Sequence, residues 1–155
     1  MELTNELQFR ATRLNDIEEL FDLRAQTREN ALSREALAAL GITPSSIAAE
    51  LRSGRAKGWV CTHRSRIVGF TMGDAHTGEV LVLAVLPNHE GKGIGRELLC
   101  RVVDELCRAG CKRLWLQASA LPTVRSHGFY RALGWRPTGE RTANGDEILQ
   151  LEREM

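Results

Sequence analysis

The sequence lacks the features of a membrane, secreted or nucleic-acid-binding protein. No segment approaches the about 18 uninterrupted apolar residues of a membrane-spanning helix, and residues 1–10 have neither the basic nor the apolar region of a secretory signal. The 21 Lys and Arg residues are balanced by 20 Asp and Glu residues, so no net positive field attracts nucleic acid or an anionic membrane. We therefore expect a cytoplasmic protein that binds neither nucleic acid nor a membrane.

Patterns of metal ligands are missing as well. The four cysteines show no CxxC spacing, and the four histidines form no HExxH or similar pattern. Buried, reduced thiols are the simpler interpretation of the cysteines. The sequence therefore predicts no metal site.

The pattern of apolar residues predicts a mixed α/β fold. With 155 residues, 43% hydrophobic and 26% charged, the chain has the composition of one globular domain spanning residues 1–155. Apolar runs bounded by turn residues predict strands over residues 7–12, 58–62, 66–74, 79–86, 113–118, 135–141 and 147–152. Helical spacing predicts helices over residues 17–23, 34–40, 44–51, 94–106 and 125–133.

These elements indicate the α/β (α+β) class. We expect a mixed, mostly antiparallel central sheet of six to seven strands with helices on both faces. The near-continuous apolar run at residues 79–86 predicts a strand that is buried on both faces. The dipeptide Asn144-Gly145 predicts a tight hairpin between the last two strands.

The most informative segment is the glycine-rich turn Glu90 to Arg96, which joins a strand to a helix. A helix N-terminus leaves about four backbone N–H groups without intrahelical partners, and glycines let an anion approach them closely. A P-loop is excluded because Lys92 is not followed by Ser or Thr. A dinucleotide fingerprint is disfavoured because the spacing is GxGxG and the turn lies deep in the chain.

The turn resembles the signature of the GNAT superfamily of N-acetyltransferases. In that signature Arg or Gln, two further residues, Gly, one residue and then Gly or Ala open the helix after a long strand. Gly93-Ile94-Gly95 fits, whereas position 90 is Glu and departs from it. Gly128 to Glu140 resembles a later motif of the family, with an aromatic-Tyr pair before Leu-Gly-aromatic. The resemblance implies the acetyltransferase fold and acetyl-CoA as cosubstrate.

The resemblance also implies which residues contact the donor. The pantetheine arm of acetyl-CoA would lie along Leu83, Ala84 and Val85, and the Val85 backbone N–H would face the thioester oxygen. The pyrophosphate would bind the turn formed by Glu90, Gly91, Lys92, Gly93, Ile94, Gly95 and Arg96. Thr123 stands where the family commonly has Asn and would offer one hydrogen bond, and Tyr130 would lie beside the sulfur.

Acetyl transfer to an amine needs a proton donor and a route for the amine proton. Tyr130 is the candidate general acid for the departing thiolate, although by residue type alone it fits an aromatic core equally well. Glu79 is the candidate general base and Asp74 the second, with water as a relay. Gln117 stands where some family members carry Glu, and an amide cannot act as a base.

We therefore predict an enzyme, an acetyl-CoA-dependent N-acetyltransferase. It would acetylate a primary amine of a small molecule or protein by direct attack in a ternary complex. The alternative is a non-catalytic acyl-CoA-binding or regulatory module, which would keep the glycine turn but would not need Tyr130. By resemblance we expect a homodimer.

Overall fold

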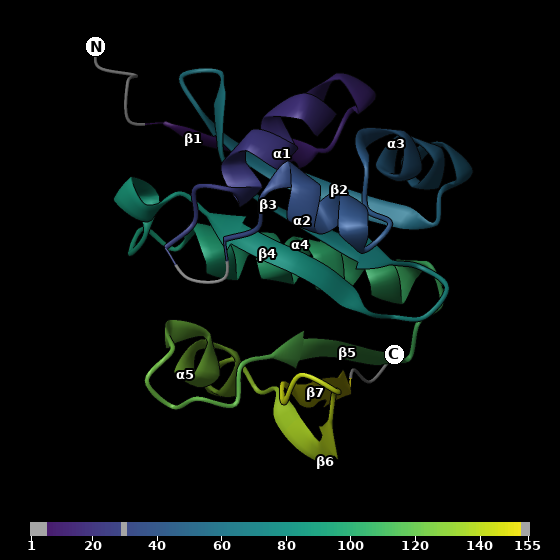
Figure 1. Ribbon diagram of the computed structural model, residues 1–155, viewed down its shortest axis with the longest axis vertical. Helices are drawn as coiled ribbons and strands as arrows, with labels where there is room; N and C mark the ends of the chain where they lie inside the picture. The colour runs from purple at the N-terminus through teal and green to yellow at the C-terminus, as the bar shows by residue number, and fades with distance from the viewer. Residues whose placement is uncertain (1–5, 29–30, 153–155) are drawn as a thin grey trace.

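The computed structural model describes residues 6–28 and 31–152. Seven strands and five α-helices follow one another along these residues, with two short 3-10 turns (Figure 1). In chain order the elements are β1 (Leu7–Ala11), η1 (Leu14–Asp16), α1 (Ile17–Arg24), α2 (Arg34–Ala39), α3 (Pro44–Ser53), β2 (Ala56–His63), β3 (Arg66–Asp74), β4 (Val80–Val85), η2 (Pro87–His89), α4 (Ile94–Arg108), β5 (Arg113–Ala118), α5 (Arg125–Ala132), β6 (Arg136–Arg141) and β7 (Glu147–Glu152).

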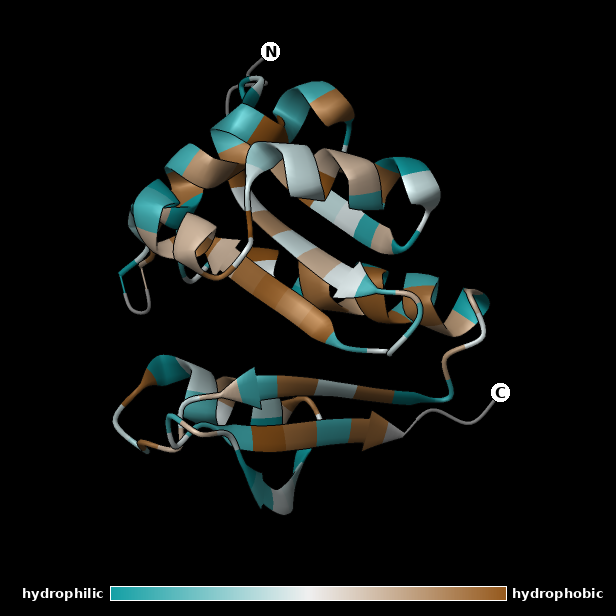
Figure 2. Cartoon of the chain, turned by 45° about the vertical axis from the view of Figure 1, so that its right-hand side comes forward, coloured by the Kyte–Doolittle hydropathy of each residue, from teal (hydrophilic) through white to brown (hydrophobic). Residues whose placement is uncertain are grey.

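The strands form two antiparallel sheets, one ordered β1-β2-β3-β4 and the other β5-β7-β6. An isolated parallel bridge between Glu79 and Trp115 links them at one end, and β4 and β5 then diverge (Figure 2). The predicted α/β class is confirmed. The expected central sheet is divided into four and three strands because pairing between β4 and β5 does not continue past the bridge.

Helices cover both faces of the four-stranded sheet. The amphipathic helix α4 packs on one face against β2, β3 and β4, and α1 and α3 pack on the other (Figure 1). The buried stripe of α4 repeats at helical spacing and consists of Ile94, Leu98, Leu99, Val102, Val103, Leu106 and Cys107. Within the described residues, no helix has the length and apolarity to cross a membrane.

The prediction that strand 79–86 is buried on both faces is wrong. Leu81 in β4 is 48% exposed, whereas β3 is buried almost throughout. The register of β3 and β4 pairs Met72 with Val82 and Gly73 with Val80, so Leu81 is the extra residue of a β-bulge. The apolar run of β4 therefore borders an opening instead of a second sheet.

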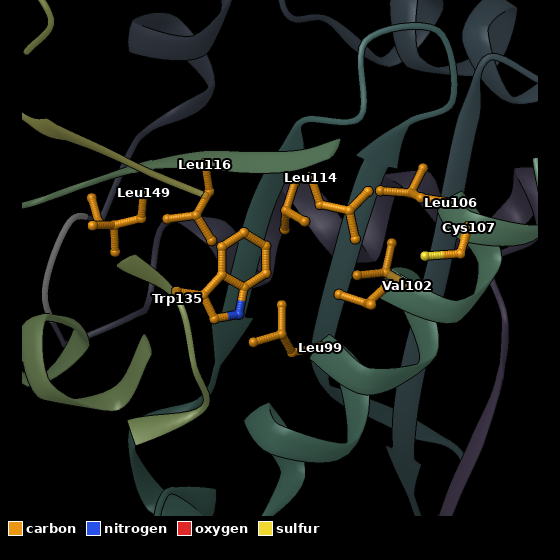
Figure 3. Close-up of a cluster of buried hydrophobic side chains, with 11 residues drawn as sticks. Leu99, Val102, Leu106, Cys107, Leu114, Leu116, Trp135 and Leu149 are labelled. Carbon is orange, nitrogen blue, oxygen red and sulfur yellow. The ribbon is translucent and has the colours of Figure 1, made fainter. Parts of the chain in front are cut away.

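The second sheet is attached to α4 by a core around Trp135. The Trp135 side chain is only 2% exposed and lies among Leu99 of α4, Leu114 and Leu116 of β5, and Leu149 of β7 (Figure 3). Because α5 ends just before Trp135, this core fixes the position of α5 beside the point where β4 and β5 diverge. The four cysteines are free, and Cys61 and Cys107 are buried as predicted, whereas Cys100 is exposed.

Candidate functional site

A cleft of about 700 Å³ opens between β4 and β5. Its walls come from β4, the glycine turn, the end of β5 and α5. The cleft brings together both sequence motifs, and the predicted donor-binding residues that line it are Leu83, Ala84, Val85, Glu90, Gly91, Gly93, Ile94, Gly95, Arg96 and Tyr130.

The glycine turn enters α4 through left-handed backbone conformations. Gly91 has φ 80° and Gly93, the N-cap of α4, has φ 81°. Among the described residues, nothing apart from the chain neighbours lies within 4 Å of the position that a Cβ would occupy at either residue, so the backbone conformation, and not crowding, requires glycine there. The first N–H groups of α4 are therefore presented at the cleft at the positive end of the helix dipole.

Glu90, the residue that departs from the family signature, is paired with two arginines. Its Oε1 accepts a hydrogen bond from Nε of Arg28 at 3.0 Å and lies 2.6 Å from Nη1 of Arg125. The Glu90 side chain is 19% exposed, whereas the Arg28 and Arg125 side chains are 58% and 57% exposed. The carboxylate is thus covered, and the cleft presents the two cations to solvent.

The backbone of β4 points the N–H group of Val85 toward the cleft. The Leu86 N–H donates to the Val68 carbonyl oxygen at 2.9 Å and so points toward β3. Consecutive N–H groups of a strand point in opposite directions, so the Val85 N–H points away from β3, toward the space that β5 has left. Val85 itself lines the cleft.

Tyr130 is both a wall of the cleft and part of the aromatic core. Its ring lies 5.2 Å from Phe129 and 6.1 Å from Trp135, measured between centroids, in edge-to-face geometry. Burial raises the pKa of Tyr130 to about 12. The phenol therefore keeps its proton at neutral pH.

Comparison with known proteins decides the family. The Acetyltransferase (GNAT) family matches residues 16–135. The chain belongs to this family. The predicted family is thereby confirmed, and with it the expectation of an acyltransferase domain.

Individual GNAT relatives are distant in sequence. A mycothiol acetyltransferase of Beutenbergia cavernae is 35% identical over 72 residues, which are 46% of this chain and 24% of the relative. The chain thus matches about a quarter of that protein's length. A PaiA N-acetyltransferase from Thermoplasma acidophilum, solved with coenzyme A, is 19% identical at a TM-score of 0.78, with 96% of this chain and 99% of that chain covered. YncA from Salmonella typhimurium, solved with its cofactor acetyl-CoA, is 18% identical at a TM-score of 0.74, with 97% of this chain and 96% of that chain covered.

Four residues expected at the site of this GNAT protein do not line the cleft. Lys92 and Thr123 are exposed, Glu79 directly precedes the lining residue Val80 at the bridge to Trp115, and Asp74 ends β3. Ser126, in the first turn of α5, lines the cleft close to where Thr123 was expected to act. The sequence could have indicated Ser126, because it carries a hydroxyl group three positions after Thr123, but this indication is weak.

Glu79 is held where β4 and β5 meet. Its Oε2 accepts a hydrogen bond from Nε2 of Gln117 at 3.1 Å, across the two strands. Burial raises the pKa of Glu79, the Gln117 hydrogen bond opposes that shift, and the charge of Asp74 adds to it. A carboxylate with a raised pKa beside the cleft is suited to take up a proton.

Asp74, the second candidate base, instead holds a turn. Its carboxylate accepts hydrogen bonds from Arg55 at 3.0 and 3.1 Å and from the backbone N–H of His76 and Thr77. Burial alone would raise the pKa of Asp74, but these partners outweigh it and the pKa lies below its ordinary value. A carboxylate stabilised in this way is a poor proton acceptor. Among the described residues, no three His, Cys, Asp or Glu side chains group as metal ligands do.

Proposed function

We propose that this GNAT protein is an N-acetyltransferase that transfers the acetyl group of acetyl-CoA to a primary amine. The amine belongs to a small molecule or a protein and attacks directly in a ternary complex. One observation supports this most strongly: a single cleft combines the N-terminus of α4, the outward N–H of Val85 and the phenol of Tyr130. The two solved relatives that hold coenzyme A or acetyl-CoA add support for the donor.

Each group of the cleft has one task in this proposal. Bound acetyl-CoA supplies the thioester. The N–H groups at the start of α4 hold its pyrophosphate, and Leu83 to Val85 align its pantetheine arm. The Val85 N–H stabilises the oxyanion that develops on the thioester oxygen. As the C–N bond forms and the C–S bond breaks, Tyr130 gives its proton to the departing sulfur.

The proton of the amine leaves by another route. Because Glu79 lies outside the cleft lining, six residues along the chain from Val85, we assign it the role of base through a chain of waters. Gln117 holds the carboxylate and cannot itself accept the proton. Arg24, Thr27 and Asp146 line the cleft from the end of α1 and from the β6–β7 turn, where an amine would enter.

Thermal melting with acetyl-CoA tests the proposal. A ligand at 100 times its dissociation constant raises the free energy of unfolding by about 2.7 kcal/mol. We expect such a rise, followed by thiol release when a panel of amines is added. The absence of a melting shift would contradict the proposal. A shift without thiol release on any amine would favour the non-catalytic acyl-CoA-binding module.

Replacing Glu79 by Gln is expected to change both rate and stability. Turnover at neutral pH should fall about tenfold, less than the about 100-fold or more of a directly placed base, because Glu79 acts through water. In the wild type, kcat/KM should rise with pH as Glu79 loses its proton, and in the variant this rise should disappear. Pre-steady-state and steady-state rates measured across pH, beside Glu140→Gln as an exposed control, check this.

The melting temperature of Glu79→Gln gives a second test that does not depend on the rate. A carboxyl group whose pKa is raised by folding destabilises the folded state once pH exceeds its ordinary pKa. Glu79→Gln should therefore melt higher than wild type at neutral pH, and the two should converge below about pH 4, where the unfolded carboxyl is protonated. A variant that melts lower at neutral pH would show that Glu79 is a structural ion and not a strained base.

A further inference from the structure

The charges around the glycine turn come from three separate segments. Glu90 precedes the turn, Arg28 follows α1, and Arg125 opens α5. Resting on the function proposed above, we propose that Arg28 and Arg125 form a two-arginine clamp on the phosphates of the donor, and that Glu90 holds this clamp in place.

Both guanidinium groups bind one oxygen atom. Arg28 through Nε and Arg125 through Nη1 meet at Oε1 of Glu90, at 3.0 and 2.6 Å. A shared acceptor keeps two like charges side by side, which their mutual repulsion would otherwise oppose. A guanidinium presents five donors in a planar fork, so engagement of one N–H with Glu90 is compatible with a phosphate on the others.

The exposure of the Glu90, Arg28 and Arg125 side chains decides whether a ligand meets positive or negative charge at this surface. The carboxylate is 19% exposed beneath two guanidinium groups that are 58% and 57% exposed. The charged residues that line the cleft are Arg24, Arg28, Arg96 and Arg125 and, with the opposite sign, Glu90 and Asp146, so arginines outnumber carboxylates there. An acidic residue at position 90 thus gives a cationic surface.

The clamp lies beside the N-terminus of α4, where the pyrophosphate is proposed to bind. Glu90 is separated from Gly93, the N-cap of α4, by two residues, so the arginines stand at the edge of the helix N-terminus that would take the pyrophosphate. Arginine forks and helix N–H groups are complementary phosphate ligands. The clamp would therefore add a side-chain contribution that an acetyl donor without phosphates cannot use.

Donors with and without phosphates test the clamp. In Arg125→Gln and in Arg28→Gln, we expect the dissociation constant of acetyl-CoA, measured by calorimetry, to rise about tenfold, as expected for loss of an exposed charge-assisted contact. The kcat/KM for acetyl-pantetheine, which has no nucleotide, should stay within about twofold of wild type. Arg108→Gln makes the same change of charge at the other end of α4, about 20 Å away, and should alter neither value.

The outcomes separate this proposal from the proposed function. Wild-type affinity for acetyl-CoA in both arginine variants, or an equal loss with acetyl-pantetheine, would overturn the clamp. A wild-type protein that binds no acetyl-CoA would overturn the function instead. With dephospho-CoA, a persisting loss in Arg125→Gln assigns that arginine to the pyrophosphate, and a vanishing loss assigns it to the 3′-phosphate.

A double variant tests the part of Glu90. If Glu90 holds the arginines, Arg125→Gln should cost less affinity in a Glu90→Gln background than in the wild type, because the clamp is already released. If the fold loss of acetyl-CoA affinity in the double variant equals the product of the losses in the two single variants, the holding role of Glu90 is overturned. Circular dichroism and melting of each variant confirm that the compared proteins are folded.

Discussion

Gly93→Pro is expected to abolish the binding of acetyl-CoA. Gly93 has φ 81°, whereas proline fixes φ near −65°, so the residue cannot enter α4 along the present path. Proline also lacks the N–H group at a turn whose donors would take the pyrophosphate. We expect affinity, measured by calorimetry, to weaken by more than about 100-fold, the equivalent of two charge-assisted contacts.

The chain offers a matched control for this prediction. Gly41 has φ 82°, and a Cβ there, as at Gly93, would meet nothing within 4 Å among the residues that the structure describes. Gly41→Ala and Gly93→Ala should each cost about 1–2 kcal/mol of stability, because both force a side chain into the left-handed region. Gly93→Ala alone should also weaken acetyl-CoA binding. Equal affinities in the two alanine variants, with normal binding in Gly93→Pro, would contradict the assignment of the turn.

Local patterns in the sequence predicted the elements and the turn. Gly93 and the apolar repeat of α4 act within one or two turns of chain, so their spacing is sufficient to place the helix start. The hairpin at Asn144-Gly145 is local in the same way, and β6 and β7 pair as predicted. These features needed no knowledge of the tertiary structure.

Long-range pairings were outside the reach of those patterns. Arg28 lies 62 residues before Glu90, and nothing periodic in the sequence connects them. The contact of Gln117 with Glu79 likewise depends on where β4 and β5 meet, which is set by packing on α4. For the same reason, the exposure of Leu81 could not be predicted from an apolar run that looked fully buried. The sequence shows that residue 90 is a carboxylate, but it does not show that Arg28 and Arg125 pair with it.

Replacing Tyr130 by Phe should separate catalysis from binding and packing. The substitution removes only the hydroxyl, so the edge-to-face contacts with Phe129 and Trp135 are retained and the melting temperature should stay close to that of the wild type. If the phenol protonates the departing thiolate, kcat should fall about 100-fold or more, while the dissociation constant of acetyl-CoA stays within about twofold. Calorimetry and thiol-release assays on one preparation measure both.

The pH dependence gives this prediction a second readout. A general acid works in its protonated form, and burial raises the pKa of Tyr130 to about 12. Loss of the proton from Tyr130 should therefore not limit the wild-type rate until pH approaches that value, so an alkaline decline near pH 10 would identify another acid. Phe129→Leu serves as the control, since it alters a ring that packs against Tyr130 but leaves the Tyr130 hydroxyl in place. Unchanged turnover in Tyr130→Phe would assign Tyr130 to the core alone, and the thiolate would then have to depart unprotonated or take its proton from water.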